Sequence, residues 1–160
     1  GNTGGQRSSA TPAAARTTTT PGGKAEGKKA IIEIMAAHRV PYAATLSIAH
    51  PDDFQEKIHK ALEIRGFRFF LVHSPCPTGW KSEPAESIEL VSLAVRSGIF
   101  PLYEVFDGVR YHLNVEPDGT DPAKYYAMQK RFGGQEIDLA GVQTAAANNV
   151  KRIRQLAGIS

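Results

Sequence analysis

The alternation of strand-like and helix-like segments constrains the fold of this chain most strongly. Residues 67–73 form a nearly continuous apolar run, which is typical of a strand covered on both faces. Residues 42–47 predict a second short buried strand. Between the two, amphipathic spacing from Pro51 onward predicts a helix that Gly66 ends. Such alternation indicates an α/β fold with a mostly parallel sheet flanked by helices.

The remaining segments extend this pattern. Asp107-Gly108 between two strand-like runs predicts a hairpin. Helices are expected near residues 30–40, 84–96, 121–131 and 141–156. The side chains expected to face the core from the helical segments are Phe54, Ile58, Ala61 and Leu62, then Ile88, Val91 and Val95, and finally Val142, Ala146, Val150 and Ile153. Asp52 or a neighbour is expected to cap the helix that begins near Pro51.

Composition excludes several classes of function. With 160 residues, 41% of them hydrophobic and 22% charged, the chain suits a single globular domain. No apolar run approaches the roughly 20 residues of a membrane span. The scattered basic pairs Lys28-Lys29, Lys130-Arg131 and Lys151-Arg152 are interpreted as solvated surface, which disfavours a nucleic-acid partner. A single cysteine forms no internal disulfide and favours a reducing compartment, and we expect the cytoplasm.

Residues 1–29 are rich in Gly, Thr, Ser, Ala and Pro. Gly4 and Gly5 allow backbone amides to approach an anion closely, and Asn2, Thr3 and Gln6 supply uncharged polar groups. The segment has neither a Walker A pattern nor Gly-x-Gly-x-x-Gly. Two interpretations stay open: a flexible tail, or a long loop ordered by a cofactor. Because no strand leads into it, we expect the chain to be the C-terminal part of something longer.

Cys76 lies between two prolines after the apolar strand. It is interpreted as a buried thiol, as a nucleophile activated by His73, or as one ligand of a metal centre completed by residues outside this chain. Trp80 nearby is expected to be a packing anchor rather than an interface residue. Both this loop and the opening loop are expected at the C-terminal edge of the sheet, where ligands bind in α/β folds.

The chain resembles the β subunit of pyruvate:ferredoxin oxidoreductase, a family of thiamine diphosphate-dependent 2-oxoacid:ferredoxin oxidoreductases. The resemblance is carried by the opening Asn-Thr-Gly-Gly-Gln motif and by Ser74-Pro75-Cys76-Pro77. Supporting matches follow in Pro41 to Thr45, Gly79-Trp80, Pro101 to Val105 and the Tyr-rich segment 121–132 with its Gln-x-Arg-Phe end.

The resemblance implies roles for particular residues. Asn2 would reach the diphosphate and the substrate carbonyl region, and Thr3, Gly4, Gly5 and Gln6 would complete the cofactor loop. Cys76 would be the last of four cysteines that hold a 4Fe–4S cluster. The other three cysteines and the Gly-Asp-Gly motif with its magnesium-binding aspartate would lie upstream of this sequence.

The resemblance also implies a partial thiamine diphosphate-binding fold in three parts: a cofactor loop (1–29), an α/β core (30–106), and a hairpin with C-terminal helices (107–160). The expected reaction converts a 2-oxoacid, with pyruvate preferred, and coenzyme A into acyl-CoA and CO₂. Ferredoxin would accept the electrons, and thiamine diphosphate, Mg²⁺ and the cluster would be the cofactors. Further α, γ or δ subunits would be partners. The open alternatives are a 2-oxoisovalerate or aryl-2-oxoacid enzyme, and a non-catalytic assembly module whose isolated chain is inactive.

Overall fold

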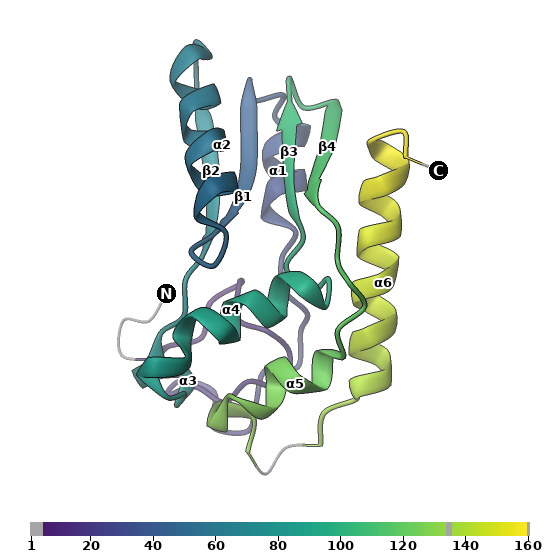
Figure 1. Cartoon of the computed structure of the whole chain (residues 1–160). Coiled ribbons are helices and arrows are strands. Elements are labelled where there is room, and N and C mark those ends of the chain that lie inside the picture. The colour runs from purple at the N-terminus through teal and green to yellow at the C-terminus, as the bar shows by residue number, and fades with distance from the viewer. Residues whose placement is uncertain (1–4, 134–135, 160) are drawn as a thin grey trace.

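The computed structural model describes residues 5–133 and 136–159 and contains an α/β fold (Figure 1). The elements, in chain order, are α1 (Ile31–Ala37), β1 (Tyr42–Ser47), α2 (Pro51–Glu63), β2 (Arg68–His73), α3 (Pro77–Trp80), the 3₁₀ turn η2 (Pro84–Glu86), α4 (Ser87–Arg96), β3 (Leu102–Phe106), β4 (Arg110–Val115), α5 (Pro122–Ala127), the 3₁₀ turn η3 (Lys130–Phe132) and α6 (Leu139–Leu156). The predicted α/β class is therefore confirmed.

The four strands of the sheet lie in the order β2-β1-β3-β4. β1 and β2 run parallel, with Tyr42 opposite Arg68 and Ser47 opposite His73. β3 runs antiparallel to both β1 and β4, so the sheet is mixed rather than mostly parallel. The predicted hairpin explains this, because Asp107 and Gly108 both have positive φ, as a tight turn between antiparallel strands requires.

β2 differs from its expected environment. It pairs with β1 on one side and is the edge strand of the sheet as described here, whereas β1 is buried at every position. Phe67, just before it, is 59% exposed, and Val72 is also exposed. The expectation of a strand covered on both faces is wrong for β2. A continuous apolar run cannot distinguish a central strand from an edge strand, and only the pairing partners decide it.

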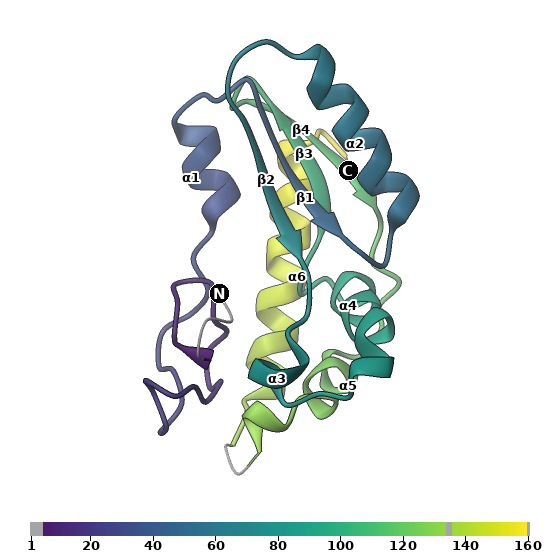
Figure 2. The ribbon, with the colours of Figure 1, turned by 90° about the vertical axis from the view of Figure 1, so that its left-hand side faces the viewer.

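Helices cover both faces of the sheet (Figure 2). Ile32 and Ala36 of α1 and Ile153 of α6 pack on the face that carries Ala43 and Val105. On the opposite face, α2 packs through Ala61 on Tyr42 and Ala44. Of the side chains expected to face inward, Leu62 is 72% exposed and Ile88 is 54% exposed, so those two assignments are wrong.

The ends of α2 and α6 follow the expected pattern only in part. α2 begins at Pro51 as predicted, but His50 precedes it without any capping bond from its side chain, and Asp52 does not cap. α6 buries Ala146 and Ile153 as predicted. Asp138 caps α6 by accepting from the Gly141 amide at 2.8 Å. Asp121 caps α5 in the same way through the Ala123 amide at 2.8 Å.

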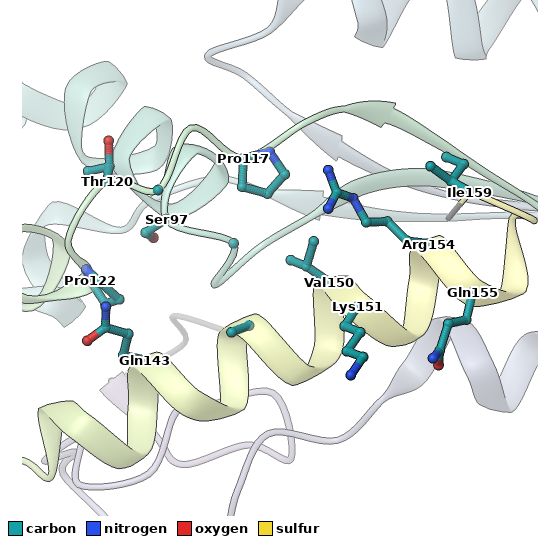
Figure 3. Close-up of a pocket in the computed structure, with 13 residues that line it drawn as sticks. Ser97, Pro117, Thr120, Pro122, Gln143, Val150, Lys151, Arg154, Gln155 and Ile159 are labelled. Carbon is teal, nitrogen blue, oxygen red and sulfur yellow. The ribbon is translucent and has the colours of Figure 1, made fainter.

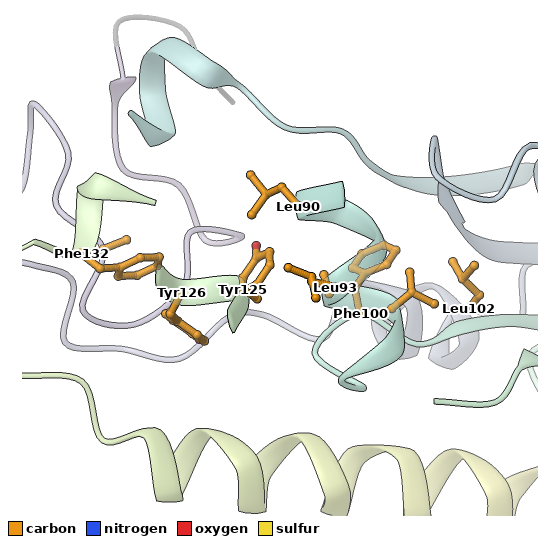
Figure 4. Packing of buried hydrophobic residues seen from close by; sticks show 10 residues of the cluster. Leu90, Leu93, Phe100, Leu102, Tyr125, Tyr126 and Phe132 are labelled. Carbon is orange, nitrogen blue, oxygen red and sulfur yellow. The ribbon is translucent and has the colours of Figure 1, made fainter. Parts of the chain in front are cut away.

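A third cluster lies below the sheet, where α4, α5 and η3 meet (Figures 1 and 4). It is built from aliphatic side chains of α4 and of the start of β3 and from aromatic side chains that follow α4 in the chain: Leu90, Leu93, Phe100, Leu102, Tyr125, Tyr126 and Phe132. Ala15 from the N-terminal segment is fully buried in the same cluster. The segment 5–29 is therefore packed against the rest of the molecule, not attached as a free tail.

The buried polar groups between the sheet and α2 form a connected network. Glu104 on β3 is fully buried and accepts hydrogen bonds from Tyr42 Oη (2.6 Å), Asn114 Nδ2 (2.7 Å) and Lys60 Nζ (3.1 Å). Beside it, the buried Lys57 Nζ donates to Asp53 (2.8 Å) and to the carbonyl of Thr45 (3.0 Å). These bonds fix the position of α2 on β1, the strand that leads to the candidate site.

Candidate functional site

A cavity of about 600 Å³ lies at the C-terminal edge of the parallel strand pair. Its wall includes Gly5 and Gln6 from the opening segment, Thr45 from β1, and His73 from the end of β2. Gly79 and Trp80 of α3 also line it, as does Arg131 of η3. The structure thus brings the opening segment and the loop after β2 to one cavity, as expected for loops that leave the C-terminal ends of parallel strands.

The opening segment is held in place by its own hydrogen bonds. Buried Lys24 donates through Nζ to the carbonyls of Thr11 (2.7 Å) and Gly27 (3.0 Å). The Thr18 amide donates to the carbonyl of Gly5 at 3.0 Å, which ties Gly5 to the segment. Gly5 has φ +65°, so its backbone takes the left-handed conformation that glycine allows. The predicted residues Asn2, Thr3 and Gly4 lie outside the described residues.

Cys76 caps the short helix α3. Its Sγ accepts from the Gly79 amide at 3.3 Å, and the thiol is partly exposed. Pro77 fits the first position of the helix because it has no amide hydrogen to satisfy. Cys76 itself is not part of the cavity wall, but Gly79 and Trp80 of the helix it caps are. The described residues contain no group of three His, Cys, Asp or Glu side chains that could hold a metal, so Cys76 would need ligands from elsewhere.

His73 is buried among aromatic rings. It stacks on Phe100 with ring centroids 4.5 Å apart and lies 5.7 Å from the Trp80 ring. Burial, together with the positive charges of Lys28 and Arg131, lowers the pKa of His73 to about 3. Within the described residues His73 Nε2 has no hydrogen-bond partner, and no hydrogen bond joins it to Cys76. A neutral, unpaired imidazole does not form the activated thiolate pair that a Cys–His hydrolase needs.

Arg131 is the site residue that the sequence analysis missed. The pair Lys130-Arg131 was expected on the solvated surface, yet Arg131 is 5% exposed and lines the cavity. Its guanidinium lies 4.2 Å from the centroid of the Trp80 ring, which confirms Trp80 as a packing anchor. Lys28 is exposed overall, and its Nζ lies 4.8 Å over the Phe100 ring. The one signal for Arg131 in the sequence was the Gln-x-Arg-Phe motif, which ends the segment 121–132 that resembles the family.

The burial of His73 as a neutral imidazole makes the stability of the protein depend on pH. Because the pKa of His73 is about 3 in the folded protein and near 6.5 when unfolded, only the unfolded chain binds the proton between these values. We expect the free energy of unfolding to fall by up to about 1.4 kcal/mol per pH unit below pH 6 because of this residue. Urea unfolding of wild type and His73→Gln at pH 7 and pH 5 checks this.

The control for this measurement is the exposed His59, which lies on α2 away from the cavity. His59→Gln should keep the pH dependence of the wild type, whereas His73→Gln should flatten it. Equal pH dependence in wild type and His73→Gln would show that His73 does not resist protonation.

A second cavity of about 610 Å³ lies between α6 and the segment after β4 (Figure 3). Val150, Lys151 and Arg154 of α6 face Pro117 and Thr120 across it. None of the buried, unpaired polar atoms recorded for the described residues belongs to its wall. Its wall has polar side chains, among them Thr120, Gln143 and Arg154, but none of them points to a missing ligand, so the first cavity is the candidate site. Across the described residues, none of the helices has the length and apolar character needed to cross a bilayer.

Comparison with known proteins finds curated relatives of this chain. No protein-family model matches the chain. The chain is 41% identical to the ketoisovalerate oxidoreductase subunit VorB of Pyrococcus horikoshii, across 99% of this chain and 53% of that protein. It is 48% identical to the pyruvate synthase subunit PorB of Methanocaldococcus jannaschii, across 82% of this chain and 46% of that protein.

The PorB subunit of Methanothermobacter marburgensis is 46% identical over a similar share of both chains. The chain spans about half the length of the curated relatives it matches. Identity at this level over most of the chain requires a common fold and a common origin. The chain is therefore a homologue, over about half of their length, of VorB and PorB, the β subunits of 2-oxoacid:ferredoxin oxidoreductases.

Proposed function

We propose that this chain is the part of a 2-oxoacid:ferredoxin oxidoreductase β subunit that binds the diphosphate end of thiamine diphosphate and supplies one ligand of a 4Fe–4S cluster. The observation that carries the proposal is the shared cavity. Gly5 and Gln6 of the Gly-rich segment line the same cavity as His73, Gly79 and Trp80, which lie on either side of Cys76 in the sequence. The homology to PorB and VorB subunits supports it.

The donor set suits an anionic cofactor. The cavity carries the cations Lys28, Lys29 and Arg131, while its one acidic wall residue, Glu33, forms an ion pair with Arg152. Two nitrogens of the buried Arg131, Nε and Nη2, and His73 Nε2 have no partner among the described residues. Uncompensated buried donors are costly unless an anion or acceptor completes them. Diphosphate oxygens and cluster sulfides are acceptors of this kind.

In this proposal each group of the chain has a limited task. The opening motif, Asn2, Thr3, Gly4, Gly5 and Gln6, would hold the diphosphate through neutral donors, and Mg²⁺ bound to residues outside this sequence would balance its charge. Thiamine diphosphate supplies the carbanion stabilisation that allows a 2-oxoacid to lose CO₂. Cys76 would anchor the cluster through its thiolate, and the rings of Trp80 and Phe100 would limit access of water from the cavity side.

The proposed overall reaction converts a 2-oxoacid and coenzyme A into acyl-CoA, CO₂ and one proton, and the two electrons released would pass singly through the cluster to ferredoxin. Pyruvate is the proposed substrate, and 2-oxoisovalerate is the second candidate, because both pyruvate synthase and ketoisovalerate oxidoreductase subunits are among the relatives. The proposed partners are the other subunits of the oxidoreductase, and the proposed location is the cytoplasm.

The experiment uses the complete polypeptide that carries this sequence, assembled with its partner subunits. Viologen reduction is measured with pyruvate or 2-oxoisovalerate, with and without coenzyme A and thiamine diphosphate. We expect turnover that requires both additions and is faster with pyruvate. Asn2→Ala should lower kcat by about a hundredfold, in line with the loss of a preorganised donor, whereas Ser9→Ala in the same segment should not.

Turnover with neither oxoacid, together with a melting temperature that thiamine diphosphate and Mg²⁺ do not raise, would contradict the proposal. That result would favour the non-catalytic assembly module.

A further inference from the structure

The two edges of the sheet differ in how they are protected. At one edge, β4 carries the polar residues Arg110, His112 and Asn114, and its ladder with β3 contains a register shift. α6 lies beside this edge (Figure 1), with Ile153 in the same hydrophobic cluster as Leu113. Polar side chains, bulges and covering helices are common ways in which a protein keeps an edge strand from pairing with another strand.

The other edge, β2, lacks these polar residues and this irregularity. It pairs only with β1 among the described residues, in one continuous register along its whole length. Arg68 at its start is its one charged residue before His73. Phe69 packs against the cluster on the α1 face and Phe70 against the cluster on the α2 face, so both faces of β2 are apolar. Such a strand is typical of the interior of a sheet, and its open edge is a template for a further strand.

The length of the relatives indicates where a further strand can come from. The chain covers 53% of the VorB subunit of Pyrococcus horikoshii and 46% of the PorB subunit of Methanocaldococcus jannaschii. About half of each relative therefore has no counterpart in this sequence. A complete polypeptide of that length can supply the strand itself, without a second copy or another subunit.

The opening segment determines which part of that polypeptide lies next to β2, and in which direction. Gly5 lines the same cavity as Val72 and His73, at the C-terminal end of β2. Residues 1–4 can span at most about 14 Å, whereas the six residues of β2 extend over about 20 Å. A strand that pairs along β2 and leads into Gly1 must therefore end near the cavity. It runs parallel to β2, because an antiparallel strand would end at the far end of β2, beyond this reach.

We propose that, in the complete polypeptide, the stretch directly before Gly1 forms a strand that pairs in parallel with the open edge of β2. This strand gives the outer backbone groups of β2 the ladder partners that an edge position does not provide. It also ends at the same edge of the sheet as β1 and β2, so it directs the opening segment into the cavity. The pairing does not depend on the cofactors of the proposed function, so either proposal can fail alone.

The test is hydrogen–deuterium exchange at single-amide resolution in the complete polypeptide, assembled with its partner subunits. Residues 42–44 of β1 are the reference, because strands pair with them on both sides. We expect every amide of residues 69–73 to be as protected as this reference, by about a hundredfold or more over an unstructured amide. Consecutive amides directly before Gly1 should be protected as well.

Two proline variants identify the pairing strand. Successive amides of a strand point to opposite sides, so one of Leu71→Pro and Val72→Pro removes a bond to β1 and the other removes a bond to the proposed strand. One variant should therefore raise exchange directly before Gly1 by about tenfold, and the other should raise it in β1. The wild-type measurement decides the proposal even where a proline variant does not fold.

Fast exchange at alternate amides of residues 69–73 in the wild type would overturn the proposal, because β2 would then be an edge strand in the complete protein. Protection of β2 without protection directly before Gly1 would also overturn it, in favour of a strand supplied from elsewhere. So would protection of β2 that disappears when the subunits are separated. Intact protection in a protein that binds neither thiamine diphosphate nor a cluster would instead contradict the proposed function and leave this pairing standing.

Discussion

Glu104→Ala is expected to lower the free energy of unfolding by about 3–5 kcal/mol. Glu104 is fully buried on β3, and three donors converge on its carboxylate: Tyr42 Oη, Asn114 Nδ2 and Lys60 Nζ. Burial alone would raise the pKa of Glu104, but Asn114, Tyr42 and Lys60 outweigh it and hold that pKa below its usual value. Removal of the carboxylate leaves the Tyr42 and Asn114 donors without this acceptor and opens a cavity beside Tyr42, whereas Lys60 keeps its ion pair with Glu56.

Urea unfolding at pH 7 measures this loss of unfolding free energy. Two further variants show where the loss comes from. Glu104→Gln keeps the volume and can still accept from Tyr42, so it should lose less than Glu104→Ala. Glu116→Ala is the matched control, because Glu116 pairs with Arg154 at 2.8 Å on the surface and should lose about 1 kcal/mol or less. A loss below 1 kcal/mol in Glu104→Ala would show that the buried network does not fix α2 on the sheet.

Gly108→Ala is expected to destabilise the protein by about 2–5 kcal/mol. Gly108 has φ +72° in the hairpin turn, and a left-handed backbone costs an L-residue about 1–2 kcal/mol. In addition, a Cβ at this position would collide with the carbonyl oxygen of Ala36 and lie 2.9 Å from Cα of Arg39. These are backbone atoms at the end of α1, so the collision forces α1 and the hairpin apart, at a further cost of about 1–3 kcal/mol.

Gly119→Ala separates the two contributions. Gly119 has φ +81°, but a Cβ there meets no atom within 4 Å, so the variant carries the backbone strain without the collision. Thermal unfolding of both variants should show a clearly larger loss for Gly108→Ala. Equal losses would mean that the close approach of the hairpin to α1 contributes nothing to stability.

The local structure of this chain could be predicted from its sequence, because each segment carries its own signal. The apolar run at 42–47 became β1, and Asp107-Gly108 became the turn between β3 and β4. The pairing of the strands was harder to predict, because an apolar run such as 67–73 indicates a preference for burial but not the number of neighbouring strands. Thus the buried strand was correctly expected for β1, whereas β2 is an edge strand in the described chain and β3 runs antiparallel to β1.

The parts of the candidate site that lie in contiguous motifs were predicted from the sequence. The part that depends on contacts between residues distant in the sequence was missed. The expectation that the opening segment and the Cys76 loop would meet at one sheet edge is confirmed for Gly5, Gln6 and α3. Arg131 was interpreted as surface because a Lys-Arg pair in sequence gives no sign of burial. Its burial depends on Trp80, some fifty positions earlier, and on η3 folding back beside α3. Spacing along the chain does not report such contacts.

The central claim is that Cys76 holds an iron–sulfur cluster beside the cavity formed by the opening segment. The direct measurement is iron and acid-labile sulfide per complete polypeptide, in wild type, Cys76→Ser and the neighbouring control Thr78→Ala. We expect Cys76→Ser to lose a cluster's complement of about four irons and four sulfides, while Thr78→Ala keeps it. If Cys76→Ser retains the same iron, sulfide and EPR signal as the wild type, Cys76 is not a ligand and the account is wrong.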